Sequence, residues 1–292
     1  MKDFLRLIRI KQWIKNGFIV VPLVFAGKFL DLIAWKQALF AVGAFSLVTA
    51  ATYVINDILD YKKDRLHPQK SMRPIAAGKI PLSWAWSLAG ILLIAGLVLL
   101  YFQKLELFQL AIFYIGLQVI YNVFTKNHVI LDVLTVAFGF QVRIWLGAVA
   151  VAVFPSLWLQ MCVLVLALFL GFTKRRYEID NLKDKAGDHR QALNEYNLYF
   201  LDQMIIISST LSIVFYGLYT ISSDLTTRIG GNELLYSICF VIYGMFRYLY
   251  LLHVKKLGDD PGEVLLKDKP LLINILLWII FIVITLLNAK VT

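Results

Sequence analysis

The chain has 292 residues, of which 60% are hydrophobic and 16% are charged, and its mean hydropathy is +0.72. These values exclude a soluble globular enzyme and indicate a protein that crosses the membrane several times. The formal net charge of +10 is expected to face anionic lipid headgroups, so membrane lipids are expected partners and a nucleic acid is not. The composition leaves open whether the chain forms a homo-oligomer.

Apolar stretches close to the ~20 residues needed to cross the hydrocarbon predict an all-α bundle of about nine transmembrane helices in one domain, residues 1–292. The predicted spans are 16–31, 35–55, 82–102, 105–123, 129–152, 155–173, 199–221, 233–252 and 270–290. The first is short, and the basic segment before it lacks the small-residue cleavage site of a signal peptide. The charged connections at about 56–81 and 174–198 are predicted to carry the active site.

The distribution of basic residues predicts the orientation of these spans. Of the 29 Lys and Arg residues, 22 lie in the N-terminal segment or in the connections after the second, fourth, sixth and eighth predicted spans. The positive-inside rule therefore places the N-terminus and the charged connections in the cytoplasm. An odd number of spans then places the C-terminus outside, and the active site is expected to face the cytoplasm.

The segment after the second predicted span concentrates charge. Its three carboxylates are spaced i, i+3 and i+7, and they are Asp57, Asp60 and Asp64. On a helix this spacing puts them near one face, so their oxygens can converge on a hard divalent cation. The basic residues around them include Arg65, Lys70 and Arg73. These would repel a cation unless an anion bound beside it, so the pattern is typical of a site for a Mg2+-bound diphosphate.

A second charged cluster follows the sixth predicted span. Its members are Lys174, Arg175, Arg176, Glu178, Asp180, Asp184 and Arg190. Three consecutive cations cannot share one helix face, so at least one is expected to point to the headgroups while another can point to the bundle interior. Four predicted spans separate the two clusters, so a bundle could bring both to one mouth. Chance recurrence in charged connections is the rival explanation.

Charge is otherwise rare within the predicted spans. None of the 19 Asp and Glu residues lies near the middle of a span, and Asp132 and Asp202 come closest. Proton- and sodium-coupled transporters usually place ionisable groups at mid-depth, so the pattern argues against a transporter, which is kept as an alternative from another class. Arg143 is the deepest charge and is expected to line a polar cavity.

The first motif, Asn56-Asp57-x2-Asp60-x3-Asp64-Arg65, resembles the aspartate-rich signature of the UbiA superfamily of intramembrane prenyltransferases, whose nine helices the chain also fits. A closer likeness, to the decaprenyl-phosphate phosphoribosyltransferase branch, runs through most of the chain. The similar segments are Lys11-Gln12-Trp13-Ile14-Lys15-Asn16, His67-Pro68, Arg73-Pro74-Ile75-Ala76-Ala77-Gly78, Tyr121-Asn122 with Lys126, Arg143, Lys174-Arg175-Arg176-x-Glu178 and Gly258-Asp259-Asp260-Pro261.

This resemblance implies an enzyme of the bacterial plasma membrane that uses Mg2+. It would transfer a 5-phosphoribosyl group from 5-phosphoribosyl diphosphate to a polyprenyl phosphate and release diphosphate, giving a lipid precursor for cell-envelope glycans. Attack by the phosphate oxygen on the face opposite the leaving group predicts inversion. The alternative within the superfamily is a prenyltransferase that moves a prenyl group from a prenyl diphosphate to an aromatic or lipid-precursor acceptor.

The resemblance also implies site residues. Asp57, Asp60 and Asp64 would be the catalytic, metal-holding residues, and a second metal would be held by Asp180 and Asp184, with Glu178 in competition. The predicted substrate-binding residues are Lys15, Asn56, Arg65, Lys70, Arg73, Tyr121, Lys126, Arg143, Lys174, Arg175, Arg176, Glu178 and Arg190. The 5-phosphate of the sugar donor is a second anion that needs its own cations, which the cluster at 174–176 would supply.

Overall fold

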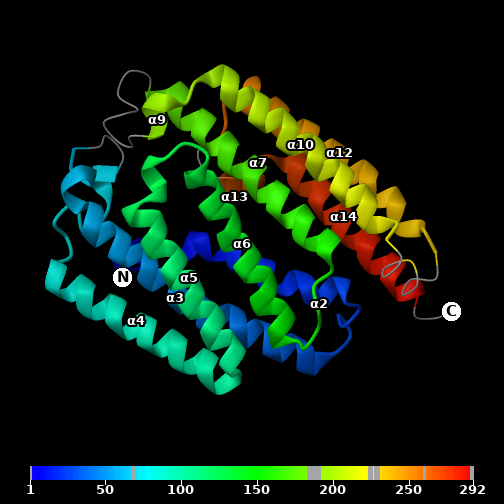
Figure 1. Ribbon diagram of the computed structural model, residues 1–292, viewed down its shortest axis with the longest axis horizontal. Coiled ribbons are helices and arrows are strands. Elements are labelled where there is room, and N and C mark those ends of the chain that lie inside the picture. The colour runs from blue at the N-terminus through cyan, green and yellow to red at the C-terminus, as the bar shows by residue number, and fades with distance from the viewer. Residues whose placement is uncertain are drawn as a thin grey trace. The chain divides into compact units, whose positions relative to one another are not determined.

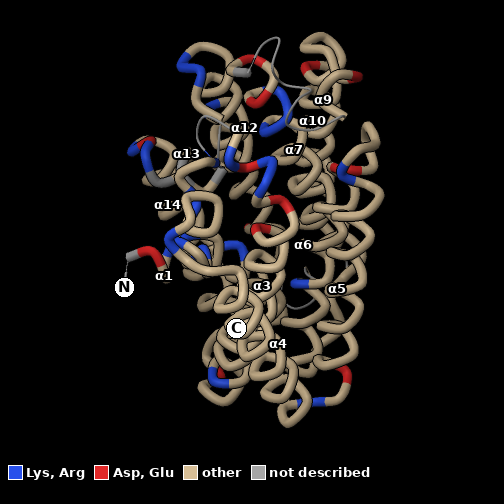
Figure 2. Tube along the Cα trace, turned by 90° about the vertical axis from the view of Figure 1, so that its left-hand side faces the viewer, with Lys and Arg blue, Asp and Glu red and all other residues tan. Residues whose placement is uncertain are grey.

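A computed structural model describes residues 2–66, 70–182, 192–222, 226, 231–258 and 261–289. Its elements within these ranges are helices and the segments that join them (Figure 1). Eight of the helices are long and apolar enough to cross a membrane. They are tan over most of their length in Figure 2, which marks Lys, Arg, Asp and Glu in colour. The predicted all-α membrane protein is therefore confirmed, whereas the orientation of its termini stays a prediction.

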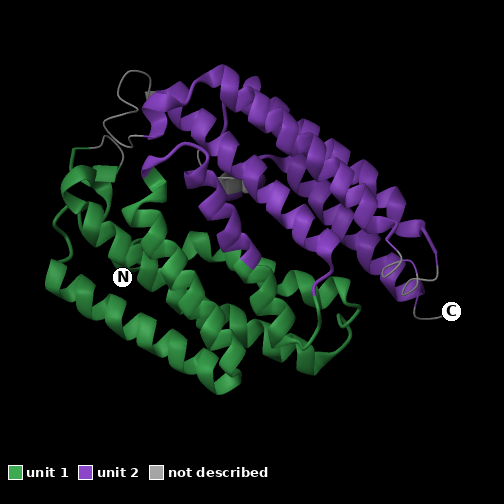
Figure 3. Cartoon of the chain, in the orientation of Figure 1, with its two compact units in different colours: residues 1–126, 142–154 green, residues 127–141, 155–292 purple. Residues whose placement is uncertain are grey.

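The chain divides into two compact units, coloured separately in Figure 3. Unit 1 comprises residues 1–126 and 142–154, and unit 2 comprises residues 127–141 and 155–292. Helix α6 (Leu131–Ala150) contributes to both. The other elements of unit 1 are α1 (Lys2–Leu7), η1 (Ile10–Val20), α2 (Val21–Phe25), α3 (Leu32–Asp64), η2 (Lys70–Met72), α4 (Leu82–Gln103) and α5 (Leu105–Val123), and η3 (Thr125–Asn127) ends on the first residue of unit 2.

Helix α3 is longer than a membrane crossing requires. Asp31 caps its N-terminus by accepting hydrogen bonds from the backbone N–H groups of Ile33 and Ala34, at 2.8 and 3.1 Å. Its 33 residues rise about 50 Å, whereas the hydrocarbon is about 30 Å thick. The predicted span ended at residue 55, but the helix continues to Asp64 and carries the aspartate motif on its last two turns.

Small residues let α3 and α4 approach closely. The buried residues on the face of α3 recur at helical spacing and include Ala34, Ala38, Ala41, Ala44 and Ala51. On α4, a Cβ at Gly96 would lie 2.8 Å from the backbone oxygen of Ala44. This small-residue contact is the usual way in which helices pack where lipid offers no hydrophobic drive to association.

The first predicted span, 16–31, is not one continuous α-helix. The 3-10 helix η1 is followed by the short α2, which has Pro22 in its first turn. A proline ring clashes with the carbonyl four residues earlier in an α-helix, so a regular helix cannot run through this position. Because a 3-10 helix rises about 2.0 Å per residue, η1 and α2 have a combined length of about 30 Å. A ninth crossing by this segment therefore stays a prediction.

Gly147 of α6 is expected to be essential for the packing of η1 in unit 1. A Cβ there would lie 1.9 Å from the backbone oxygen of Ile19, and backbone cannot move aside as a side chain can. Gly147→Ala is therefore expected to lower stability by about 1–3 kcal/mol, seen as a lower unfolding temperature in detergent. The matched control is Gly116→Ala in α5, where nothing lies within 4 Å of an added Cβ. Equal unfolding temperatures for the two variants would contradict the close approach.

Unit 2 is built on α7 (Leu157–Leu182), which packs along α10 (Leu198–Thr220), and on α12 (Ile238–His253), which packs against α14 (Lys269–Asn288). Its remaining elements are α9 (Ala192–Glu195), η5 (Glu233–Ser237) and α13 (Pro261–Lys267). Helix α7 has 26 residues and a length of about 39 Å. It therefore continues past the predicted span end at residue 173, and the second charged cluster begins on a helix instead of in a loop.

The start of α14 is fastened by a charge pair. Asp268 accepts a hydrogen bond from the backbone N–H of Leu271 at 2.9 Å, which caps the helix. It also receives two hydrogen bonds from Arg247 of α12, at 3.1 and 2.8 Å. The hydrogen bonds from Arg247 lower the pKa of the Asp268 carboxyl, so it is ionised at neutral pH. Arg247 is a charged residue within a predicted span, and its pairing with Asp268 gives it a structural role.

Candidate active site

The turn after η2 brings Arg73 back toward α3. Backbone hydrogen bonds from Ala77 N to Arg73 O (2.8 Å) and from Lys79 N to Pro74 O (2.9 Å) close one helical turn. Gly78 ends it at a φ of 70°, a conformation that glycine adopts without steric cost. Arg65 fastens the same turn, because its Nε donates to Ala76 O at 3.0 Å. Five residues of the motif at 73–78 therefore have a role in forming this turn.

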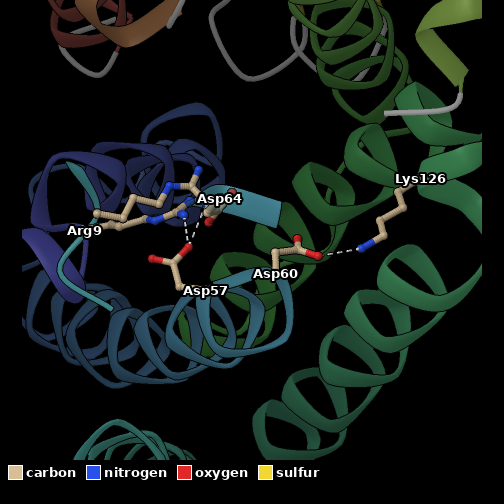
Figure 4. A network of polar contacts seen from close by, with 6 residues as sticks. Arg9, Asp57, Asp60, Asp64 and Lys126 are labelled. Atoms are coloured by element: carbon tan, nitrogen blue, oxygen red, sulfur yellow. Dashed lines mark hydrogen bonds and ion pairs between the residues drawn. The ribbon is translucent and has the colours of Figure 1, made fainter. Parts of the chain in front are cut away.

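Each of the three aspartates on α3 contacts a basic residue of unit 1 (Figure 4). Arg73 Nη1 donates to Asp57 Oδ1 at 3.0 Å and to Asp64 Oδ2 at 2.7 Å. Asp57 forms a further ion pair with Arg9. Asp60 accepts from Lys126 Nζ at 3.2 Å. The side chains of Asp57 and Asp64 are 3% and 7% exposed, so each of these buried carboxylates has the cationic partner that a buried charge requires.

The three carboxylates do not converge as predicted. Among the residues that the structure describes, no three His, Cys, Asp or Glu side chains lie close enough together to hold a metal ion. At 100° per residue, positions 57 and 64 lie about 20° apart, whereas position 60 is rotated by about 60° from position 57 and by about 40° from position 64. Figure 4 shows the result, with Asp60 directed toward Lys126.

Two of the carboxylates nevertheless fit a divalent cation. Oxygens of Asp57 and Asp64 already converge on one positively charged nitrogen, Nη1 of Arg73. Hard carboxylate oxygens suit Mg2+, which commonly takes one or two carboxylates and fills its remaining positions with water and substrate phosphates. The residues present therefore fit Mg2+ held together with an anionic substrate, and the assignment of Asp57, Asp60 and Asp64 as its ligands stays a prediction.

Arg9 is a site residue that sequence reasoning missed. It lies between α1 and η1 with a φ of 50°, and its guanidinium lies 5.1 Å from the ring centre of Tyr53 while it pairs with Asp57. Basic residues near an N-terminus are expected from topology alone, so nothing in the sequence singled it out. The signal that could have found it is Asp57, since a buried carboxylate requires a cationic partner.

Arg143 is buried in unit 1, with 4% exposure. Its Nε donates to Asn16 Oδ1 at 2.9 Å and its Nη2 lies 3.4 Å from the Tyr114 hydroxyl. The guanidinium also lies over the rings of Phe45 and Tyr114. These contacts shield the charge from the membrane interior. They also tie α6 to η1 and α5, so Arg143 has a structural role whether or not it positions a phosphate.

In unit 2, Arg175 is the buried member of the second cluster. Its side chain is 5% exposed, and its Nε donates to Asp132 Oδ2 at 2.7 Å. It also pairs with Glu178 one turn further along α7. The prediction that one of the three consecutive cations points inward is confirmed. This guanidinium is already shared between two carboxylates, which limits its capacity to bind a substrate phosphate.

Tyr196 completes the environment of Asp132, which is fully buried. The phenol donates to Asp132 Oδ1 at 2.8 Å and accepts from the backbone N–H of Ile130 at 2.6 Å. Burial, and then the Asp132 carboxylate, raise the pKa of Tyr196, so the hydroxyl stays protonated as a donor. The bond to Ile130 holds a β-branched residue at a φ of 69°, a strained conformation.

The second deep acid also pairs with the cluster. Arg176 Nε donates to Asp202 Oδ1 at 2.5 Å. The two acids that come closest to the middle of a predicted span, Asp132 and Asp202, thus both form ion pairs with basic residues of α7. The other predicted residues lie on η1 (Lys15), α3 (Asn56), η2 (Lys70), α5 (Tyr121) and α7 (Lys174, Asp180). Asp184 and Arg190 lie outside the described residues.

The long apolar helices define an integral membrane protein, and each of its two units carries a cluster of paired charges. The UbiA prenyltransferase family matches residues 18–260, and the chain belongs to this family. The decaprenyl-phosphate phosphoribosyltransferase of Mycolicibacterium smegmatis is 31% identical over 290 residues, covering 96% of this chain and 91% of that protein. The protein of the same name from Corynebacterium glutamicum is 30% identical, covering 96% and 85%.

Among solved structures, a UbiA homolog from Archaeoglobus fulgidus bound to DMAPP and Mg2+ has the same fold, with a TM-score of 0.72 and 17% identity over 97% of this chain and 99% of that one. The resemblance inferred from the motifs is confirmed, and the chain is a transferase enzyme. A transporter is set aside, since the family is one of transferases. The choice between sugar and prenyl donors is taken up below.

Proposed function

We propose that this protein transfers the 5-phosphoribosyl group of 5-phosphoribosyl diphosphate to a polyprenyl phosphate and releases diphosphate. The observation that carries the proposal is the match, over nearly the whole chain, to decaprenyl-phosphate phosphoribosyltransferases. The product would be a lipid-linked precursor of cell-envelope glycans. We further propose that the reaction takes place in the bacterial plasma membrane, with the charged clusters facing the cytoplasm, as the distribution of Lys and Arg predicts.

Asp57 and Asp64 are the proposed metal ligands, with Asp60 as a third carboxylate nearby and Asp180 and Asp184 as candidates for a second ion. A divalent cation at such a site neutralises the charge that develops on a diphosphate leaving group. This use of a metal is consistent with the Mg2+ bound in the Archaeoglobus fulgidus homolog. Basic residues beside the aspartates, Arg73 and Lys126, would donate to the diphosphate oxygens as the anomeric C–O bond breaks.

The acceptor needs no general base. The phosphate of a polyprenyl phosphate is already anionic at neutral pH, so its oxygen can attack the anomeric carbon directly. Attack from the face opposite the diphosphate would invert the configuration. Lys15, Tyr121 and Arg143 are the predicted positioning residues for donor or acceptor. Of these, Arg143 would act through the hydrogen bonds that orient its guanidinium, as a residue locked by its neighbours is better preorganised.

The sugar donor carries a 5-phosphate that a prenyl diphosphate lacks. Lys174 is the proposed partner of this group. Arg175 is buried between Asp132 and Glu178, so it is better suited to hold α7 in place. Asn56 and Glu178 are the proposed partners of the ribose hydroxyls, because amide and carboxylate oxygens accept hydrogen bonds from hydroxyl groups. None of these partners would be required for a prenyl donor.

Lys174→Gln tests the donor. Affinity for 5-phosphoribosyl diphosphate is expected to fall by about 1.5–3 kcal/mol, the usual value of a charge-assisted hydrogen bond. Affinity for inorganic diphosphate should stay close to that of the unaltered protein, because inorganic diphosphate has no 5-phosphate. Both constants can be measured by calorimetry on protein purified in detergent. Lys255→Gln, an exposed lysine after α12, is the control for the change in net charge.

Competition with geranyl diphosphate completes this experiment. Displacement of 5-phosphoribosyl diphosphate by inorganic diphosphate, but only weak displacement by geranyl diphosphate, is the expected outcome. A protein that binds geranyl diphosphate and ignores the sugar donor would belong functionally with the prenyltransferases of the family.

A further inference from the structure

In the described contacts of the aspartate site of unit 1, three carboxylates are matched by three cations. Its three carboxylates are those of Asp57, Asp60 and Asp64, and the three cations that contact them are Arg9, Arg73 and Lys126. A divalent cation arriving alone would join three positive groups and would have to displace them from the oxygens. A diphosphate arriving alone would join three negative groups. Either ligand alone therefore meets electrostatic resistance that the two together do not.

Arg9 and Arg73 contact the two carboxylates that are proposed as metal ligands. Nη1 of Arg73 lies within hydrogen-bond distance of both Asp57 and Asp64, at 3.0 and 2.7 Å, and Arg9 pairs with Asp57 from another part of the chain. Both side chains are about one-quarter exposed, at 22% for Arg9 and 26% for Arg73. They are thus partly open to solvent, unlike the carboxylates they cover, and their heads can turn toward an incoming anion.

We propose that Arg9 and Arg73 form a latch on the metal site. In the absence of substrate they hold Asp57 and Asp64 in place of a metal ion. When metal and diphosphate arrive together, Asp57 and Asp64 would release the two guanidinium groups and hold the ion, and Arg9 and Arg73 would turn to donate hydrogen bonds to the diphosphate oxygens. Metal and diphosphate then strengthen each other's binding reciprocally. The latch rests on the proposed metal-diphosphate site, and it is independent of whether the donor is a sugar or a prenyl group.

Arg9 is the better residue for a test. Removing it leaves Asp57 paired with Arg73, so the buried carboxylate keeps a partner and the fold is expected to survive. Arg6 supplies a matched control, because it is an exposed arginine on the neighbouring α1. Arg6→Gln removes the same charge from the same segment away from the aspartates. Arg9→Lys keeps the charge and should restore much of the behaviour of the unaltered protein.

The experiment measures Mn2+ binding by the electron paramagnetic resonance of free Mn2+, with purified protein and without phosphate anions. Arg9→Gln is expected to bind Mn2+ about tenfold more tightly than the unaltered protein, because a competing cation has been removed. Arg6→Gln and Arg9→Lys should stay within about twofold. Inorganic diphosphate should then strengthen Mn2+ binding less in Arg9→Gln than in the unaltered protein. Formation of Mn2+–diphosphate in solution is common to all samples and cancels in this comparison.

The outcomes separate the latch from the site itself. If the unaltered protein binds Mn2+ with diphosphate, but Arg9→Gln has the same or a weaker affinity for Mn2+ alone, the latch is wrong and the site stands. If the unaltered protein binds neither Mn2+ nor diphosphate in any combination, the metal-diphosphate site fails, and the latch with it. An equal gain in Arg6→Gln would reduce the effect to net charge and would also overturn the latch.

Discussion

Asp57→Asn is expected to reduce turnover by at least about 100-fold, as is typical when a group that stabilises charge at a reacting centre is lost. The Asp57 carboxylate pairs with both Arg9 and Arg73. One of its oxygens and one oxygen of Asp64 contact the same nitrogen, Nη1 of Arg73. Asparagine has nearly the same shape but neither the charge nor the metal affinity. The measurement is diphosphate release under saturating donor and acceptor with Mg2+ present.

Two further measurements separate a loss of chemistry from a loss of folding. They are the turnover of Asp60→Asn and the elution of each purified variant from a sizing column. Asp60 is 26% exposed and contacts Lys126, so its replacement disturbs packing less than a change at the buried Asp57. A comparable loss of turnover in both variants, with unchanged elution from a sizing column, would identify chemistry as the cause. Near-normal turnover in both would contradict the metal assignment.

Arg175→Gln is expected to have the largest effect on stability. It would leave the fully buried Asp132 carboxylate without its arginine partner, although the hydrogen bond from Tyr196 would remain. Breaking a buried pair by removing one member costs about 3–5 kcal/mol. A much lower unfolding temperature in detergent, or little folded protein in the membrane, is the expected result. Loss of donor binding in this variant would therefore say nothing about a contact with the 5-phosphate.

A double substitution tests the cause of that loss. Asp132→Asn together with Arg175→Gln removes both buried charges, so part of the lost stability should return. Lys174→Gln, one residue away on the same helix, should unfold within a few degrees of the unaltered protein. If the double variant is no more stable than Arg175→Gln alone, the pair is not what stabilises this end of α7.

The helical membrane class was predictable because apolar stretches of sufficient length have few other structures available to them. The ends of the helices were harder to predict. Helices α3 and α7 continue through their charged ends, since a helix that leaves the hydrocarbon can keep its backbone hydrogen bonds while its side chains meet water. The segment at 16–31 is divided by Pro22, a residue whose local effect outweighs the apolar pattern around it.

The site was predictable where its residues are close in sequence. The aspartate spacing and Arg73 lie within one segment, and their contacts follow from the turn that Gly78 closes. Arg9 and Asp57 are 48 residues apart, and Arg175 and Asp132 are 43 apart, so tertiary packing alone brings them together. The two acids that come closest to the middle of a predicted span, Asp132 and Asp202, could have been used to predict a contact. An acid near the hydrocarbon requires a cation, and the basic run at 174–176 supplies it.

The central claim is tested most directly by a transfer assay with purified protein in phospholipid vesicles. Radiolabelled 5-phosphoribosyl diphosphate and a short polyprenyl phosphate are supplied, with and without Mg2+. The predicted result is a labelled lipid that forms with an equimolar release of diphosphate, and only when both the metal and the polyprenyl phosphate are present. No labelled lipid from the sugar donor, together with prenyl transfer from geranyl diphosphate to an added aromatic acceptor, would contradict it.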